Sequence, residues 1–428
     1  MTLNPNLLDD LEARGLIHDT TDKAALAERL AEGPIGVYDG FDPTAKSLHV
    51  GNLMGLLLLR RFQLAGHRAI ALAGGSTGMI GDPGGKSAER NLLDADTLTE
   101  NLEAIKGQLS RFLDFEGGNP AILVNNYDWT KDVSALEFMR DVGKHITVNQ
   151  MVAKDSVKSR MSSETGISYT EFSYMLLQAY DFWWLSENEN CEMQIGGSDQ
   201  WGNISLGVEL IRKKSQKKAF ALTTPLLTKA DGSKYGKTAG GETLWLDPEM
   251  MSPYRFYQAW MQTPDEDVEK LLLQFTLLEL DVIAEVMSEH NADPAARVGQ
   301  KRIAQELTTL VHGAEATGRA QSVSGVLFGK TDVGSLDEET LQALAAEVPT
   351  AQLSNSLLAD DDNCSVILSN AEVVASKSEA ARLIKQNGVA VNGAKLVAGQ
   401  AISKDDLQHG KYVVVHKGKK AVHVLEFV

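Results

Sequence analysis

The feature that most constrains the fold is a strand–helix–strand alternation that begins near residue 33. The segment GPIGVYDGF is a short apolar run typical of a strand, and HVGNLMGLLLLRRFQLAG has the apolar spacing of a helix that ends near Gly66. A second strand-like run, HRAIALAGG, follows at once. These pieces predict a βαβ unit with parallel strands, and similar alternation continues to residue 240. Ligands of such sheets bind at the carboxyl ends of the strands, where GFDPTA and GGSTGMIGDPGGKSAER would emerge.

The rest of the chain falls into three parts. Residues 250–330 contain helical patterns with few glycines, such as DVEKLLLQFTLLELDVIAEVMSEH, and predict an α-helical domain. Residues 331–362 hold eight acidic residues and no Lys or Arg, and we expect an acidic linker there. Residues 363–428 read as a helix, SKSEAARLIKQNG, followed by strands. The expected division is therefore 1–249, 250–330, 331–362 and 363–428.

Charge is unevenly distributed along the chain. The formal net charge is -17, but residues 363–428 hold nine Lys and Arg against five Asp and Glu, so this part is +4 and the remainder is -21. A basic module on an acidic chain indicates a polyanionic partner. Cys191 and Cys364 are the only cysteines, which excludes a disulfide framework and favours the reducing cytoplasm. No apolar run reaches the ~18 residues that a membrane span needs, so we expect no membrane partner.

Two glycine-rich loops carry cations. Neither is a phosphate-binding Walker motif, because the position that must be glycine is Ile80 in one loop and Asp231 in the other. Cations in glycine-flanked loops nevertheless suit groups that close on phosphates, although solvated loop charge is the alternative for either loop alone. The loop cations are Lys86, Arg90, Lys234 and Lys237.

A helical pattern that starts after Ser168 carries three polar residues on one face. Tyr174, Gln178 and Asp181 are spaced i, i+4 and i+7. Polar side chains on an otherwise apolar helix need partners if they are buried. The stripe is therefore either a binding surface or a solvated face.

Several motifs together resemble bacterial tyrosyl-tRNA synthetases over nearly the whole chain. HVGN at 49–52 resembles the HIGH signature of class I aminoacyl-tRNA synthetases, and KYGKT at 234–238 resembles their KMSKS loop. YDGFDPTA, GDPGGKSAER, EFSYMLLQAYDF and QIGGSDQWGN accompany them, and their joint order is specific although each motif alone is weak. The resemblance implies a Rossmann-like parallel-sheet catalytic domain, an α-helical anticodon-proximal domain and a small α+β S4-like RNA-binding domain.

The same resemblance implies a ligase with two steps. L-tyrosine would be activated with ATP to tyrosyl-adenylate and pyrophosphate, and tyrosine would then pass to the 3′-terminal adenosine of tRNA(Tyr). The implied catalytic residues are His49, Thr44, Lys86, Arg90, Lys234, Lys237 and Gln200. Contacts to ATP are implied for Gly51, Asn52, Gly197, Asp199, Lys234, Lys237 and Thr238. ATP is a substrate that brings Mg²⁺, and no tightly bound metal or organic cofactor is expected.

The polar stripe gains a role from the resemblance. Asp181 and Tyr38 would bind the phenolic hydroxyl of tyrosine, and Tyr174, Gln178 and Asp82 would hold its α-amino group. Phenylalanine lacks the hydroxyl and would leave the first two groups buried without partners, which disfavours its binding.

Two positions depart from the family pattern. Asn52 stands where the HIGH signature ends in histidine, and because asparagine still donates hydrogen bonds we expect retuned nucleotide contacts. Asp39 stands where relatives often carry cysteine and would add a carboxylate near the ribose, in a role that the sequence leaves open.

The implied partners are tRNA(Tyr), L-tyrosine, ATP and a second copy of the chain in a homodimer. RNA contacts are expected at Lys377, Arg382, Lys385, Lys417, Lys419 and Lys420, with an ordinary solvated surface as the alternative. RKKSQKK at 212–218 is either a frayed helix end or an acceptor-stem contact.

Three other functions compete with this reading. A different nucleotidyltransferase would lack the helical region and the basic tail, and a non-catalytic RNA-binding derivative would have lost the pocket polar groups. A tryptophan-specific relative is disfavoured by the pair of Tyr38 and Asp181.

Overall fold

The computed structural model describes residues 3–82, 94–162, 166–228, 235–236, 241–328, 331–359, 363–418 and 421–428. The chain folds into two compact units. Unit 1 comprises Met1–Met251 and Met261–Leu307, and unit 2 comprises Ser252–Trp260 and Thr308–Val428. Among the described residues, no helix combines the length and the apolar character needed to cross a membrane.

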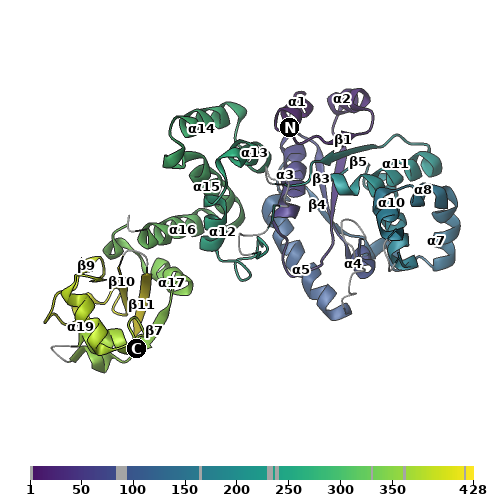
Figure 1. Ribbon diagram of the computed structural model, residues 1–428. Helices are drawn as coiled ribbons and strands as arrows, with labels where there is room; N and C mark the ends of the chain where they lie inside the picture. Colours follow the sequence, from purple (N-terminus) through teal and green to yellow (C-terminus); the bar gives the residue numbers. More distant parts are fainter. Residues whose placement is uncertain are drawn as a thin grey trace. The chain divides into compact units, whose positions relative to one another are not determined.

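Unit 1 is built on a six-stranded sheet (Figure 1). In spatial order its strands are β1 (Asp19–Thr20), β6 (Phe220–Thr224), β5 (Cys191–Gly197), β2 (Gly36–Phe41), β3 (Arg68–Ala73) and β4 (Ile122–Asn125). The short β1 is antiparallel to β6, and all other neighbours are parallel. The predicted βαβ unit is confirmed as β2, α3 (Val50–Leu64) and β3, and the α/β fold class is confirmed with it.

Helices cover both faces of this sheet. α3 and α5 (Ala95–Phe112) lie on one face, and α10 (Tyr169–Asn188) and α11 (Trp201–Ser215) lie on the other (Figure 1). Apolar residues occur on all sides of α3, so the helix is buried in the interior of the unit. Leu53, Leu56 and Leu58, for example, are fully buried. The other helices of this part are α1 (Leu7–Ala13), α2 (Lys23–Glu32), α4 (Gly75–Ile80), α6 (Tyr127–Thr130), α7 (Ala135–Asp141), α8 (Val148–Val152) and α9 (Asp155–Met161).

The helical region after residue 250 is divided between the two units. α13 (Asp265–Phe275) and α14 (Leu280–Ala292) belong to unit 1, whereas α12 (Pro253–Met261) and α16 (Ala314–Leu327) belong almost wholly to unit 2. The chain passes from unit 1 to unit 2 within α15 (Val298–His312), between Leu307 and Thr308. The expected helices are present, but their grouping differs from the single domain expected over 250–330.

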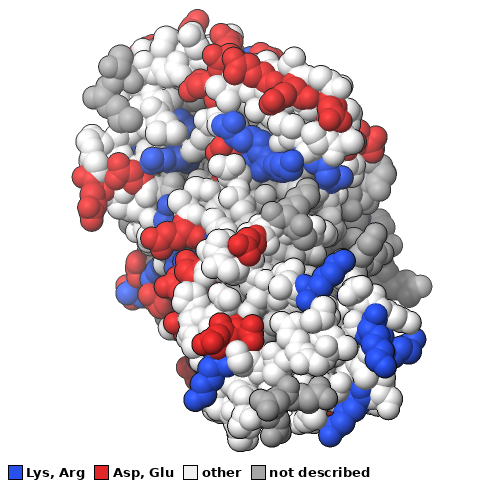
Figure 2. Space-filling model, turned by 90° about the vertical axis from the view of Figure 1, so that its left-hand side faces the viewer, with Lys and Arg blue, Asp and Glu red and all other residues white. Residues whose placement is uncertain are grey.

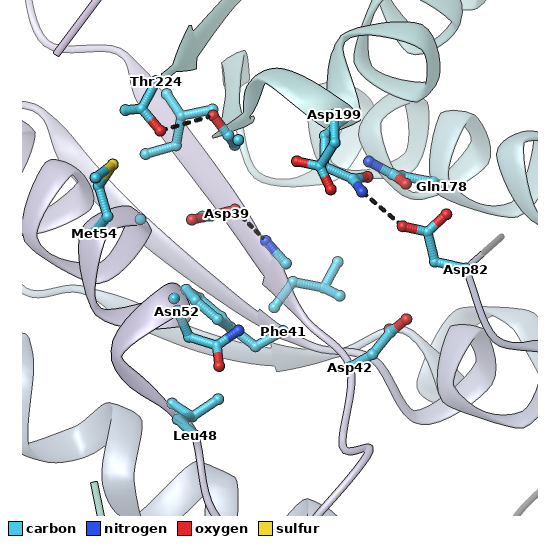
Figure 3. Close-up of a pocket in the computed structure, with 18 of the residues that line it drawn as sticks. Asp39, Phe41, Asp42, Leu48, Asn52, Met54, Asp82, Gln178, Asp199 and Thr224 are labelled. Atoms are coloured by element: carbon cyan, nitrogen blue, oxygen red, sulfur yellow. Dashed lines mark hydrogen bonds between the residues drawn. The ribbon is translucent and has the colours of Figure 1, made fainter. Parts of the chain in front are cut away.

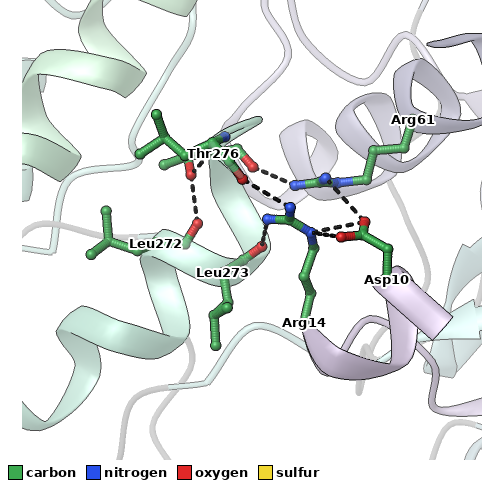
Figure 4. A network of polar contacts seen from close by, with 7 residues as sticks. Asp10, Arg14, Arg61, Leu272, Leu273 and Thr276 are labelled. Carbon is green, nitrogen blue, oxygen red and sulfur yellow. Dashed lines mark hydrogen bonds and ion pairs between the residues drawn. The ribbon is translucent and has the colours of Figure 1, made fainter. Parts of the chain in front are cut away.

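Buried arginines explain why α13 belongs with the sheet. Arg14 and Arg61 are 3% and 7% exposed, and they reach the end of α13 from α1 and α3 (Figure 4). The Arg14 guanidinium donates to the Leu278 carbonyl at 2.8 Å, and Arg61 donates to the Thr276 carbonyl. Asp10 pairs with Arg14 at 2.9 Å and with Arg61 at 3.7 Å. Both accepting carbonyls lie just after the last residue of α13, so the two arginines hold this end of the helix next to α1 and α3.

Unit 2 contains a five-stranded sheet with both faces buried. Its order is β7 (Thr350–Leu353), β11 (Ala421–Phe427), β10 (Tyr412–Lys417), β8 (Val389–Val391) and β9 (Ala394–Lys395). β7 is parallel to β11 and the other pairs are antiparallel. Val413 and Val415 enter one core with α18 (Cys364–Asn370) and α19 (Lys377–Lys385), while Val414 enters a second core with α16 and α17 (Glu338–Glu347).

The expectation of an acidic linker over 331–362 therefore differs from the structure. α17 buries Leu341 and Leu344, and β7 adds a strand to the sheet of unit 2. The acidic residues of this segment surround an apolar i, i+3 pair, Leu341 and Leu344, that forms part of a core. Residues 360–362 lie outside the described part of the chain.

Candidate active site

A cavity of about 400 Å³ opens in unit 1 at the carboxyl ends of β2 and β5 (Figure 3). Most of the predicted site residues that the structure describes line it. These are Tyr38, Thr44, His49, Gly51, Asn52, Asp82, Tyr174, Gln178, Asp181, Gly197, Asp199 and Gln200. The predictions at Lys86, Arg90, Lys234, Lys237 and Thr238 lie outside the described residues.

One end of the cavity presents a buried carboxylate and a buried hydroxyl. Asp181 is 1% exposed, and its two oxygens accept hydrogen bonds from Asn126 Nδ2 and Trp129 Nε1, both at 2.9 Å. Burial raises the Asp181 pKa to about 7. Tyr38 is also 1% exposed, and its hydroxyl has no hydrogen-bond partner among the described residues. Tyr174, Gln178 and Asp181 on α10 thus face the cavity and not bulk solvent.

Asn126 and Trp129 were missed by the sequence reasoning. They follow β4 in a segment that carries no recognised motif, and only the tertiary structure brings them to Asp181. Trp129 is held by stacking on Trp184, with ring centroids 4.2 Å apart.

A carboxylate that the sequence did not predict as a site residue, Asp42, orients Tyr174. The Tyr174 hydroxyl donates to Asp42 Oδ2 at 2.7 Å, and Thr77 Oγ1 donates to Asp42 Oδ1 at 2.6 Å. Burial and the nearby carboxylates raise the Tyr174 pKa well above its usual value, so the phenol keeps its proton. Asp42 lies within the GFDPTA motif, which was the available signal for a functional role.

A chain of side-chain hydrogen bonds links the next group of predicted residues. Asn203 Nδ2 donates to Gln178 Oε1 at 3.0 Å and to Gln200 Oε1 at 3.2 Å. Gln200 Nε2 in turn donates to Asp82 Oδ2 at 2.6 Å. These bonds fix the orientation of the side-chain amides of Gln178 and Gln200. Asn203, the hub of this chain, was not predicted.

The first signature forms the N-terminal turn of α3. Asn52 Oδ1 accepts from the His49 backbone N–H at 3.0 Å, and His49 Nδ1 accepts from the Gly51 N–H at 3.0 Å. Asn52 therefore caps the turn through its oxygen, which leaves its amide group as the donor that faces the cavity. Burial lowers the His49 pKa, so the ring is neutral near pH 7.

Asp39 places a further buried carboxyl on the cavity wall between β2 and α3. Its Oδ1 accepts from the Gly40 N–H at 2.9 Å, and burial raises its pKa to about 7. A Cβ atom on Gly55 would lie 2.2 Å from Asp39 Oδ2, so the absence of a side chain at residue 55 makes the room for this carboxyl. Asp39 and Gly55 are therefore a matched pair.

The predicted RNA contacts lie in unit 2. Lys377, Arg382 and Lys385 are exposed on α19, whereas Lys419 and Lys420 lie outside the described residues. Lys417 has partners inside the unit, because its ammonium donates to the Val373 carbonyl at 3.0 Å. Figure 2 shows Lys and Arg side chains in separate groups, with acidic side chains as well as uncharged surface between them.

The basic segment 212–218 begins in the last turn of α11, which ends at Ser215, and its lysines contact neighbouring residues of unit 1. Lys213 donates to the His145 carbonyl at 2.9 Å, and Lys214 donates to the Asp141 carbonyl at 3.2 Å. Lys214 also lies 4.1 Å from the centre of the Trp183 ring. These contacts differ from a frayed helix end.

Comparisons with known proteins agree with this geometry. The family model for class I tRNA synthetases (W and Y) matches residues 30–329, and the model for the SYY-like C-terminal domain of tyrosine–tRNA ligases matches residues 340–425. The tyrosine–tRNA ligase of Opitutus terrae is 51% identical, over 99% of this chain and 100% of its own. That of Porphyromonas gingivalis strain W83 is 50% identical, over 98% and 99%.

Solved structures give the same picture. A C-terminally truncated mitochondrial tyrosyl-tRNA synthetase of Aspergillus nidulans superimposes with a TM-score of 0.68 at 33% identity, covering 75% of this chain and 94% of that one. A similar enzyme of Coccidioides posadasii gives a TM-score of 0.65 at 33% identity, covering 73% and 90%.

Proposed function

Since this chain belongs to the class I tRNA synthetases, among the tyrosine–tRNA ligases, we propose that its cavity binds L-tyrosine at the Asp181 end and ATP at the His49 end. The activity is that of a tyrosine–tRNA ligase: tyrosine is activated with ATP to tyrosyl-adenylate and then transferred to tRNA. The observation that carries the assignment of the pocket is the buried pair of Tyr38 and Asp181, a donor without a described partner beside an acceptor.

This pair is complementary to a phenolic hydroxyl. Each Asp181 oxygen accepts one N–H hydrogen bond and retains a second lone pair. Asp181 can therefore also accept a hydrogen bond from the phenolic hydroxyl. The Tyr38 hydroxyl can donate to the phenolic oxygen. A phenylalanine ring would leave both groups desolvated, a cost of about 1–3 kcal/mol for each unsatisfied group.

The middle of the cavity suits the α-ammonium and carboxylate groups of an amino acid. Because the Tyr174 hydroxyl donates to Asp42, its oxygen lone pairs are available to an ammonium. Asp82 and the Gln178 carbonyl oxygen complete the acceptors. Gln200 stands beside them, and we assign it to the carboxylate that reacts.

At the other end, the first signature faces the nucleotide. The neutral His49 ring accepts at Nδ1, so its Nε2 carries the proton and donates to a phosphate oxygen. The N-terminus of α3 adds partial positive charge that favours an anion. Thr44 assists at the phosphates, Asn52 donates through its amide, and Gly197 and Asp199 hold the ribose. Lys86, Arg90, Lys234, Lys237 and Thr238 complete this proposal from the sequence.

The chemistry needs little beyond positioning. The tyrosine carboxylate attacks the α-phosphorus, the bond from that phosphorus to the bridging oxygen breaks, and pyrophosphate leaves with its charge neutralised by donors and cations. Mg²⁺ enters with ATP as part of the substrate. A hydroxyl of the terminal tRNA adenosine then attacks the carbonyl of the adenylate and displaces AMP.

Three finer features complete the proposal. The exposed cations of α19 bind tRNA in unit 2 through salt-dependent contacts. The chain forms a homodimer, for which the support is an apolar surface on α7 and α8, where Leu136, Met139 and Val148 are 79%, 53% and 62% exposed. The cytoplasm is the proposed location, because both cysteines are free and tRNA is the substrate.

ATP–pyrophosphate exchange tests the assignment of the pocket. We expect exchange with tyrosine, and little with phenylalanine or tryptophan. Asp181→Ala should abolish discrimination and lower kcat/KM for tyrosine by about a hundredfold or more, since a buried donor–acceptor set is left incomplete. Gln274→Ala is the matched control, because it removes a buried side-chain bond to the Gly15 carbonyl in the same unit but outside the cavity.

Two results would contradict the proposal. Exchange that runs equally well with tryptophan would contradict the phenol-binding role of Tyr38 and Asp181. Absence of exchange with all three amino acids, from folded wild-type protein, would contradict the adenylation step itself.

A further inference from the structure

Backbone hydrogen bonds join the turn that carries His49 to the segment 244–247, which does not line the cavity. His49 and Trp245 form an antiparallel backbone bridge. The Val50 N–H donates to the Leu244 carbonyl at 3.0 Å, and the Leu246 N–H donates to the Leu48 carbonyl at 2.9 Å. The segment 244–247 follows KYGKT (234–238) in the sequence by a few residues. The bridge therefore links the HVGN turn to the part of the chain that comes after KYGKT.

A buried polar cluster fixes the register of that bridge. The Asp247 N–H donates to Ser47 Oγ at 3.0 Å, and the Leu48 N–H donates to Gln108 Oε1 at 2.8 Å. Gln108 Nε2, from α5, also donates to Ser47 Oγ at 3.3 Å. Ser47 and Gln108 are 4% and 5% exposed, so a slip of the bridge by one residue would leave buried polar groups without partners.

Within this frame, the Trp245 indole lies beside the His49 imidazole. The ring centroids are 6.1 Å apart and the planes are inclined by 52°. Trp245 does not line the cavity. On one side the imidazole is held by the Gly51 N–H at its Nδ1, and on another it meets the indole. A ring held in both ways keeps its Nε2–H aimed in one direction.

We propose that Trp245 is a positioning residue for ATP activation, which acts by holding the His49 imidazole in the orientation that points Nε2–H at the nucleotide phosphates. The proposal rests on the proposed function, because it needs His49 to meet ATP. Without the indole, the imidazole gains freedom to rotate about its side-chain bonds and gains access to water. A donor that no longer points at one place loses most of its value in the transition state.

The test is a double-mutant cycle between Trp245 and His49, read by ATP–pyrophosphate exchange on the full chain. We expect Trp245→Ala to lower kcat/KM for ATP on the order of tenfold and to leave KM for tyrosine unchanged. Trp245→Phe should restore most of the loss, since it keeps an aromatic wall. In a His49→Asn background the Trp245→Ala change should have almost no further effect.

A second readout does not depend on activity. His49 is titrated by NMR in the wild type and in Trp245→Ala, with His49→Asn used to assign its signal. Loss of the indole should raise the His49 pKa toward its ordinary value, because burial is what lowers it. Trp183→Ala is the control: Trp183 is another partly buried tryptophan of unit 1, its Nε1 donates to Ser215 at 2.9 Å, and it does not line the cavity.

The outcomes separate cleanly. An additive loss in the double mutant, or an unchanged His49 pKa in Trp245→Ala, overturns the positioning role. If wild-type protein shows no exchange at all, the proposed function fails, and the titration still decides whether Trp245 holds His49. Should Trp245→Ala fail to fold, Trp245→Leu takes its place in the cycle and in the titration.

Discussion

At the scale of single residues, the cavity contains two carboxyl groups, Asp39 and Asp181, whose burial raises the pKa of each to about 7. A folded protein that holds a carboxyl in this way gives up stability when the group ionises. The Asp181 oxygens accept two N–H bonds that partly offset this cost, whereas Asp39 accepts the Gly40 N–H. Ionisable residues whose burial lowers the stability of the folded protein are typical of binding sites.

Asp39 gives a pH-dependent prediction. Its folded pKa of about 7 lies above the ordinary value of 3.8, so the folded state binds this proton more tightly than the unfolded state does. The associated stability is therefore present at pH 4, falls as pH rises, and is lost above pH 7. We expect Asp39→Asn to stabilise the unliganded protein at pH 8, by about 1.4 kcal/mol for each unit of pKa displacement, and to have a much smaller effect near pH 4.

Urea unfolding at the two pH values measures this difference. Asn keeps an oxygen for the Gly40 N–H and has nearly the same volume, so packing is not changed. If Asp39→Asn changed the free energy of unfolding equally at both pH values, ionisation of Asp39 would not destabilise the folded protein.

At the scale of elements, α3 connects the turn that carries His49 to the helical region. Its first turn carries His49 and Asn52, and near its other end Arg61 donates to the carbonyl at the end of α13. Burial and the neighbouring Arg14 lower the Arg61 pKa to about 10, which leaves the guanidinium charged at neutral pH. One helix thus carries a turn that lines the cavity at its start and a buried arginine that contacts α13 near its end.

Arg61→Met should loosen α13 from the sheet. The Thr276 carbonyl would lose a charged donor at a buried helix end, a loss on the order of 1–3 kcal/mol. Urea unfolding gives the loss of stability, and hydrogen exchange should rise in the last turn of α13. Arg60→Met is the matched control on the same helix, because Arg60 is only half-buried and donates to Gln63. Equal exchange in the two variants would contradict this role of Arg61.

At the scale of the whole molecule, the cavity and the exposed cations of α19 belong to different units. Unit 1 holds the cavity, and unit 2 carries exposed cations on α19. Adenylation and tRNA binding should therefore respond to different substitutions.

The triple variant Lys377→Ala, Arg382→Ala and Lys385→Ala should raise KM for tRNA in the aminoacylation assay and weaken its salt dependence. ATP–pyrophosphate exchange should not change, because these residues lie in unit 2. A control triple at Lys23, Lys106 and Lys131 in unit 1 carries the same charge change. If both triple variants raised KM for tRNA equally, the change in net charge alone would explain the effect, and the residues of α19 would have no specific role.

The homodimer makes a separate prediction. Leu136→Glu should convert a dimer to a monomer in sedimentation equilibrium, since a charge buried in an apolar interface is costly. Val397→Glu changes a residue of unit 2 that is 55% exposed and should leave the mass unaffected. A monomeric wild type would contradict the proposed dimer.

The sequence by itself determined the features that depend on local pattern. The period and length of the apolar runs predicted β2, α3 and β3, the spacing on α10 predicted a shared face for Tyr174, Gln178 and Asp181, and motif order predicted the family. Each of these follows from residues close together in the chain, where backbone geometry alone relates side chains to one another.

Only the tertiary structure decided which distant groups complete the site. Asn126 and Trp129 reach Asp181 across more than fifty positions, Asp42 reaches Tyr174 across an even longer separation, and Trp245 meets His49 through a bridge between segments far apart in sequence. The same applies to α13, which joins the sheet through Arg61, and to α17, which packs into unit 2. Such contacts are set by how whole elements pack, and packing sums many weak interactions that no local pattern records.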